Sequence, residues 1–99
     1  MIHSGKLVTR ITILGEIFEN QAGFCAVLRK FYFGEDGEID KDEELVDPYA
    51  IRDKFDELEN ILTHDGYEKE SGDLITGETG SRLGRIRAFY KYIGATQTN

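Results

Sequence analysis

The 99 residues predict an α+β fold, in which a small antiparallel sheet of about four strands is covered by one amphipathic helix. Three observations predict this fold. Two segments rich in β-branched residues lie near the N-terminus, on either side of a short polar stretch. A helical pattern with clear end signals occupies the middle of the chain, and short strand-like segments follow it. The length suits a single domain over residues 1–99.

The N-terminal segments predict a β-hairpin. Residues 6–18 alternate so that Ile11 and Ile13 share one face, while Arg10 and Thr12 share the other. Residues 19–23 form the predicted loop, and residues 24–33 form the second strand. Its two faces are Phe24, Ala26, Leu28 and Tyr32 against Cys25, Val27, Phe31 and Phe33. A helix over about residues 20–30 is the alternative, because the alanines there tolerate it.

The middle of the chain predicts an exposed acidic loop followed by the helix. Residues 34–47 have the composition of a solvated loop. The helix spans about residues 48–64, with Asp47 as its cap, Pro48 at its first position and Gly66 at its end. Its apolar stripe recurs every three or four residues and consists of Ile51, Phe55, Leu58 and Leu62.

The C-terminal part is less regular. Residues 67–70 and 74–76 predict two short strands around a turn, and residues 77–84 predict a glycine-rich loop. Residues 85–93 fit a strand, with Arg85, Arg87, Phe89 and Lys91 on one face and Ile86, Ala88, Tyr90 and Tyr92 on the other. A helix is the alternative, because Leu83, Ile86, Tyr90 and Ile93 also recur at helical spacing. The aromatic content favours the strand. Residues 95–99 predict a frayed tail.

The charge is strongly segregated along the chain. The formal net charge is -7, from 12 basic and 19 acidic side chains. Residues 35–78 hold 17 of the acidic side chains and four of the basic ones, whereas the two flanking parts hold two acidic and eight basic ones. An acidic middle between basic ends favours electrostatic steering and partner choice.

The first functional hypothesis uses the acidic segment. We expect a non-enzymatic protein-interaction module, a small acidic regulator or inhibitor that docks on a basic surface of a larger protein, such as a nucleic-acid-binding protein. The contact would be made by Asp36, Glu38, Asp40, Asp42, Glu43 and Glu44. The same carboxylates do not fit a calcium loop, because a loop starting at Asp36 would have Lys41 where glycine is required.

The alternative hypothesis is a binder of a phosphorylated ligand, either a nucleotide or a single-stranded nucleic acid. The glycine-rich loop could form an anion nest, while cations neutralise phosphate and aromatic rings stack on a base. The residues for this role are Arg82, Arg85, Arg87, Phe89, Tyr90, Lys91 and Tyr92. A strand over residues 85–93 would gather the cations on one sheet face, whereas a helix would distribute them around its circumference.

The sequence contains little that supports other classes of function. One cysteine and two histidines cannot build a zinc site, and no residue pattern predicts a nucleophile or a catalytic carboxylate pair. We therefore expect no enzyme, no metal and no cofactor. No apolar run is long enough for a membrane span and no signal-peptide pattern is visible, so a cytoplasmic location is expected. A homodimer through the aromatic sheet would add stability.

Overall fold

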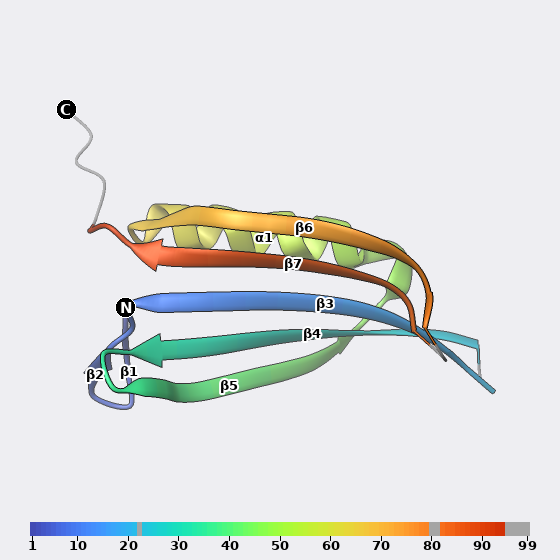
Figure 1. Ribbon diagram of the computed structural model, residues 1–99, viewed down its shortest axis with the longest axis horizontal. Coiled ribbons are helices and arrows are strands. Elements are labelled where there is room, and N and C mark those ends of the chain that lie inside the picture. Colours follow the sequence, from blue (N-terminus) through green and yellow to red (C-terminus); the bar gives the residue numbers. More distant parts are fainter. Residues whose placement is uncertain (22, 80–81, 95–99) are drawn as a thin grey trace.

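The fold is a five-stranded antiparallel sheet with one helix on one face and a small N-terminal hairpin at one end (Figure 1). The computed structural model describes the backbone of residues 1–21, 23–79 and 82–94, and their side chains except those of residues 20, 73–79 and 82–83. In this part of the chain the elements are β1 (Ile2–His3), β2 (Lys6–Leu7), β3 (Arg10–Asn20), β4 (Gly23–Gly34), β5 (Gly37–Val46), the 3₁₀ turn η1 (Pro48–Ala50), α1 (Ile51–His64), β6 (Tyr67–Thr79) and β7 (Arg82–Tyr92).

The sheet has the strand order β5-β4-β3-β7-β6. Strands β3, β4 and β5 form a meander, and the β6–β7 hairpin joins the other side of β3 after the chain has passed through α1. Strand β3 is therefore central, although it comes early in the sequence. The predicted α+β class with one covering helix is confirmed. The strand count differs, because the described residues form five strands in the main sheet and a separate two-stranded hairpin.

The acidic segment accounts for the extra strand. Residues 34–47 were expected to form a loop, but Gly37–Val46 is the edge strand β5 and pairs with β4 from Gly34↔Gly37 to Ala26↔Val46. An edge strand keeps much of its surface in water, so it accepts charged side chains that a central strand would exclude. Cations of β4 also lie beside these acids: Arg29 Nε is 2.8 Å from Glu43 Oε2, and Lys30 Nζ is 4.0 Å from Asp42 Oδ2.

Several other boundaries differ from the prediction. The first long strand begins at Arg10 rather than Lys6, because Lys6–Leu7 pairs with Ile2–His3 in a separate hairpin. Residues 67–76 form one continuous strand with an irregularity between Lys69 and Ser71, instead of two strands around a turn. Most of the expected glycine-rich loop is also strand, since Thr79 pairs with Arg82. Residues 80–81 and the expected tail at 95–99 lie outside the described residues.

The two helix-or-strand alternatives are both resolved in favour of strands. Residues 23–34 form β4, so the helix considered over residues 20–30 is not formed. Residues 82–92 form β7, as the aromatic content of this segment favours. The prediction of a strand over most of residues 85–93 is therefore confirmed.

The helix begins and ends where its sequence signals predict. The side chain of Asp47 accepts a hydrogen bond of 3.0 Å from the backbone N–H of Tyr49, and Pro48 starts the 3₁₀ turn that leads into α1. Beyond the helix, Gly66 has a φ of 92° and donates its N–H to the carbonyl of Thr63. Glycine adopts this conformation without the steric cost that other residues meet. No helix of the described residues is long and apolar enough to cross a membrane.

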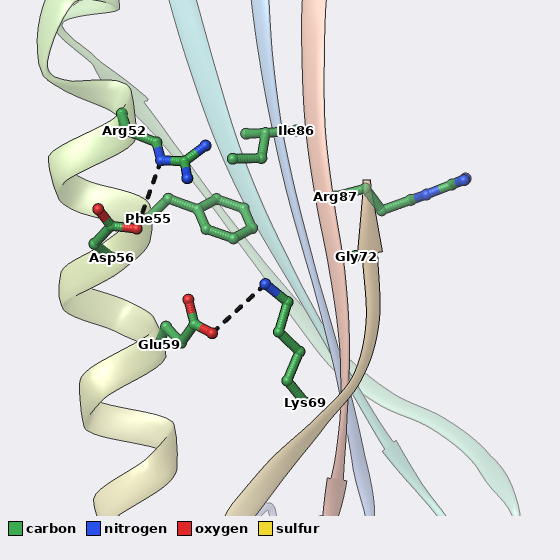
Figure 2. A pocket seen from close by; sticks show the side chains of 8 residues that line it. All are labelled: Arg52, Phe55, Asp56, Glu59, Lys69, Gly72, Ile86 and Arg87. Carbon is green, nitrogen blue, oxygen red and sulfur yellow. Dashed lines mark ion pairs between the residues drawn. The ribbon is translucent and has the colours of Figure 1, made fainter. Parts of the chain in front are cut away.

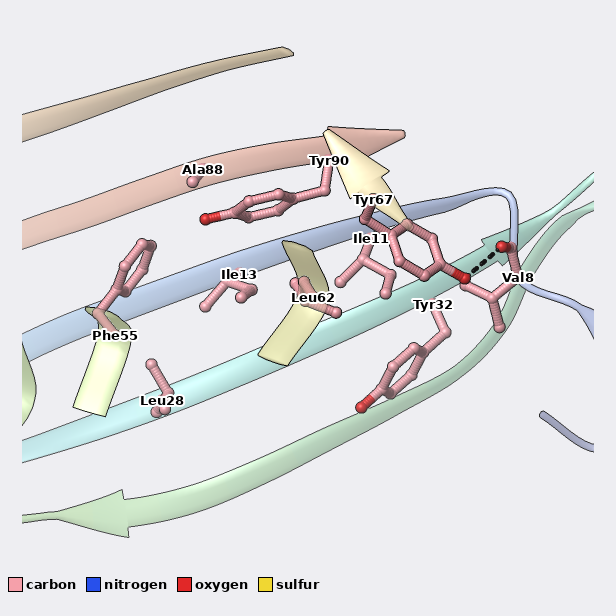
Figure 3. Packing of buried hydrophobic residues seen from close by; sticks show 10 residues of the cluster. All are labelled: Val8, Ile11, Ile13, Leu28, Tyr32, Phe55, Leu62, Tyr67, Ala88 and Tyr90. Atoms are coloured by element: carbon pink, nitrogen blue, oxygen red, sulfur yellow. Dashed lines mark hydrogen bonds between the residues drawn. The ribbon is translucent and has the colours of Figure 1, made fainter. Parts of the chain in front are cut away.

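The core lies between α1 and the inner face of the sheet (Figure 3). Phe55 and Leu62 of the helix pack among residues of the central strands, including Ile13 and Tyr90. The Tyr67 hydroxyl, also buried, donates a hydrogen bond of 2.6 Å to the carbonyl of Val8. The start of the helix approaches β3 closely at Gly15, where an added Cβ would lie 3.0 Å from Ile51 Cδ1 and 3.0 Å from Ile86 Cγ2.

Candidate functional site

The face of the sheet opposite α1 is the candidate site. Because strand side chains alternate, the strands that send Ile11, Ile13, Ala88 and Tyr90 toward the helix send their other residues to the opposite side. Among the described residues, no element covers that side (Figure 1). We call the helix-free side of β4, β3 and β7 the open face. Its central residues are Val27, Arg29, Phe31 and Phe33 of β4, Arg10, Thr12, Leu14 and Glu16 of β3, and Arg85, Arg87, Phe89 and Lys91 of β7.

The open face is basic although the whole chain is acidic. Its central residues include five cations (Arg10, Arg29, Arg85, Arg87 and Lys91) and a single carboxylate, Glu16. Three phenylalanines share the same surface. Strands β4 and β7 come from distant parts of the sequence, and both pair with β3, which brings these side chains together. The flanking strands add carboxylates to the same side, since Glu43 of β5 lies opposite Arg29 and Glu68 of β6 lies opposite Lys91.

The registers arrange these residues in rows across the strands. Thr12 lies opposite Phe31 on one side and Phe89 on the other, so a short side chain separates two aromatic rings. In the next row Leu14 lies between Arg29 and Arg87. The Arg87 guanidinium carbon is 5.3 Å from the centre of the Phe89 ring, a cation–π contact between the two rows. A row that contains two aromatic rings therefore lies next to a row that contains two guanidinium groups.

One end of the open face contains an ion pair with a buried carboxylate. Glu16 is only 7% exposed and forms an ion pair with Arg29, whose Nε also donates to Glu43. The hydrogen bond to Glu43, together with the charges of Glu43 and Glu16, raises the pKa of the Arg29 guanidinium against the opposing effect of burial. On the other side of Glu16 lies Arg85, whose Nε is buried and has no hydrogen-bond partner in the part of the chain that the structure describes.

A groove of about 210 Å³ crosses the other end of the open face. Its side-chain lining comes from four strands and comprises Arg10, Thr12, Phe33, Glu70 and Phe89. Ile11 and Tyr90 also border it, although their buried side chains belong to the core. The groove combines two aromatic walls, one cation and one carboxylate, which is a mixture suited to a flat polar ring rather than to an apolar ligand.

A second cleft, of about 200 Å³, lies on the helix side between α1 and the β6–β7 hairpin (Figure 2). Its charged side chains are paired with each other: Arg52 Nε is 3.7 Å from Asp56 Oδ1, and Lys69 Nζ is 3.6 Å from Glu59 Oε1. The Arg87 side chain points away from this cleft, toward the open face (Figure 2). The helix-side cleft therefore offers an anion little uncompensated positive charge.

The structure brings together part of the C-terminal set that the sequence predicts. Arg85, Arg87, Phe89 and Lys91 share the open face, as expected for a strand. Tyr90 and Tyr92 do not: Tyr90 is 1% exposed in the core, and the Tyr92 ring lies 5.2 Å from Tyr67. The backbone of Arg82 belongs to β7, but its side chain and the tip of the expected anion nest lie outside the described residues.

Sequence reasoning missed the half of the open face that comes from the N-terminal strands. Arg10, Arg29, Phe31 and Phe33 join the C-terminal cations there. Alternation within residues 10–18 and 24–33 already separates these residues from the core. The missing information was the pairing of β3 with β7, which alternation does not reveal.

The six acidic residues of the first hypothesis do not form one patch. Asp40, Asp42 and Glu44 lie in β5 opposite residues of β4 that face the helix side, whereas Glu43 pairs with Arg29. His3 Nδ1 is 3.4 Å from Asp40 Oδ2, and Lys54 Nζ is 3.9 Å from Glu44 Oε1. Tyr32 donates a hydrogen bond to Asp42. Burial is the main cause that raises the pKa of Tyr32, and this hydrogen bond is the next. Asp36 lies in the turn before β5, and Glu38 near the start of the strand.

Comparison of the chain with family models, with curated proteins and with solved structures gives no match. The geometry and charge of the open face are therefore the features that bear on function.

Proposed function

We propose that the protein binds single-stranded nucleic acid on the open face of its sheet. The observation that carries the proposal is the gathering of five cations and three phenylalanines on one uncovered surface. Proteins that bind single strands combine a positive track for the phosphates with aromatic rings on which bases stack. The rows of the open face supply both, at the spacing that neighbouring strands impose.

The local charge of the open face outweighs the overall acidity of the chain for this purpose. A phosphate near the middle of the surface would meet Arg85, Arg87 and Lys91 of β7 at close range, whereas Arg29 is already paired with Glu16 and Glu43. Many of the other carboxylates lie on α1 or on the helix side of β5. Charges separated by more than about 10 Å are largely screened at moderate salt. The distant acids would still lower affinity, which favours a modest and salt-sensitive interaction over a tight one.

The acidic interaction module is the second candidate, and the structure supports it less well. Four of its six carboxylates already have partners within the chain: Asp40, Asp42, Glu43 and Glu44. A docking partner would have to compete with those contacts. Neutralising β5 carboxylates is the test of this candidate, and slower association with a basic protein partner would favour it.

The main test compares two variants that remove the same charge from opposite faces. Binding of a fluorescein-labelled oligothymidylate or oligouridylate of about 15 nucleotides is measured by fluorescence anisotropy over a range of salt concentrations. Replacing Arg85 and Arg87 with alanine is expected to weaken binding and to reduce the slope of log K against log salt by about 1.4, since each phosphate contact contributes about 0.7 for a single strand. Replacing Arg52 and Lys54 with alanine is the matched control.

Both control residues lie on α1, where Arg52 is paired with Asp56 and Lys54 with Glu44, so the double variant takes away two positive charges without touching the open face. The helix-side variant should therefore keep the wild-type salt slope. Circular dichroism confirms that both variants are folded. The proposal is overturned if the wild-type protein binds neither oligonucleotide at low salt, or if the two variants lose affinity equally.

A further inference from the structure

The groove at one end of the open face contains a carboxylate that phosphate binding does not explain. Glu70 lines the groove, and it is the residue at which the pairing of β6 with β7 is irregular: Lys69 pairs with Tyr90 and Ser71 with Phe89, which leaves Glu70 without a cross-strand partner. Such a bulge turns a side chain away from the regular alternation. Among the described residues, Glu70 has no ion-pair partner.

An ionised carboxylate repels phosphate. On a face that binds phosphates it therefore suits a part of the ligand that donates hydrogen bonds. Ionised Glu70 only accepts hydrogen bonds, and its two oxygens can accept two parallel ones. Guanine is the base that presents two adjacent donors on its Watson–Crick edge, the N1–H and the N2 amino group. Cytosine and adenine each present one amino group beside a ring acceptor, and uracil and thymine present one N–H between two carbonyls.

We infer that the groove binds a guanine base of single-stranded nucleic acid, with Glu70 accepting from N1–H and the N2 amino group. This inference rests on the proposed function of the open face. Phe89 lies on β7, between the strands that carry Glu70 and Arg10, and its ring provides the stacking surface. Strands β6 and β3 are two inter-strand spacings apart, or roughly 10 Å, which a purine stacked on Phe89 would bridge.

The adjoining edge of the base, which carries O6 and N7, would face Arg10. Arginine pairs with the O6 and N7 acceptors of guanine in the commonest base-specific contact of proteins with DNA. The groove therefore offers acceptors at its β6 side and donors at its β3 side, in the order that guanine requires. Adenine would place an amino group beside Arg10 and an unfilled acceptor beside Glu70.

The test uses oligothymidylate that carries a single central guanine, inosine, adenine or cytosine, with anisotropy as the readout. For the wild-type protein we expect the guanine oligonucleotide to bind roughly tenfold more tightly than the all-thymine one. Inosine, which lacks the N2 amino group, should fall between them. Glu70→Gln should abolish the preference for guanine without lowering the affinity for oligothymidylate.

Glu68→Gln is the matched control. Glu68 lies on the same strand, opposite Lys91, and does not line the groove. Its neutralisation should leave the preference for guanine intact. If all the oligonucleotides bind the wild-type protein equally, the guanine inference is overturned and the proposed function stands. The same holds if the preference survives in Glu70→Gln. If no oligonucleotide binds, the proposed function itself fails, and the inference fails with it.

Discussion

Replacement of Gly15 by alanine is expected to destabilise the protein, although the same change usually stabilises a strand. Glycine in a strand interior costs about 0.5–1 kcal/mol relative to alanine, because its unfolded chain has more freedom. Here the new Cβ would lie 3.0 Å from both Ile51 Cδ1 and Ile86 Cγ2, between the start of the helix and β7. Overpacking of this kind costs about 1–3 kcal/mol. We expect a net loss of about 1–2 kcal/mol in the free energy of unfolding.

A double-mutant cycle assigns that loss to a particular contact. Ile51→Val removes Cδ1, the atom that the new methyl group would meet on the helix. Ile86→Val keeps Cγ2 and so keeps the contact on β7. The cost of Gly15→Ala should therefore fall by about 1 kcal/mol in the Ile51→Val background and stay unchanged in the Ile86→Val background.

Urea unfolding followed by circular dichroism measures each corner of the cycle. The slopes of free energy against urea should agree among the variants, which shows that only stability has changed. An increase in stability for Gly15→Ala would refute the reasoning. Equal costs in the two valine backgrounds would show that the helix contact is not the source of the strain.

Two further predictions concern the core. Phe55→Ala removes a side chain that is 2% exposed between helix and sheet. It should lower the free energy of unfolding by about 3–5 kcal/mol, with a large drop in the urea midpoint. A loss of free energy below about 1 kcal/mol would contradict the packing described. Tyr67→Phe leaves the carbonyl of Val8 without its donor and should cost about 1–3 kcal/mol in the same assay. Burial raises the pKa of Tyr67 to about 12 from its ordinary 10.0, so the neutral side chain stabilises the fold fully below pH 10, and this contribution is lost as the pH rises through 12. Tyr67→Phe should therefore make the alkaline fall in the urea midpoint shallower, and an unchanged pH profile would count against this role.

The parts of the fold that local signals control were predictable. The helix follows from the capping of Asp47, the position of Pro48 and the apolar stripe that includes Phe55, and the structure confirms each of them. The faces of β4 follow from simple alternation, with Leu28 in the core and Phe31 outside it. These features depend on a few neighbouring residues, which the sequence displays directly.

The edge strand β5 was not predictable from composition. Five carboxylates within the ten residues of β5 are typical of a solvated loop, and the prediction treated them so. An edge strand needs backbone pairing on only one side, and its charged side chains can remain in water while Arg29 and Lys30 of β4 lie beside them. Composition reports exposure to solvent, which a loop and an edge strand share.

The candidate site was half predictable for a related reason. Alternation within residues 85–93 places Arg85, Arg87 and Phe89 on one face, and the structure agrees. The contribution of Arg10 and Phe33 depends on which strand lies beside β3. That choice is made by packing between distant parts of the chain, and it leaves no local signal in the sequence.

The pairing of β3 with β7 has a consequence for the order of folding. Thr12 meets Phe89 across almost the whole length of the chain, so this contact closes a long loop and should form late. Until the β6–β7 hairpin docks, β3 is an unprotected edge rich in isoleucine, which is the state most open to aggregation. The same docking step completes the rows of rings and guanidinium groups. A partly folded chain would therefore lack the complete surface, and under the proposed function it would not bind an oligonucleotide.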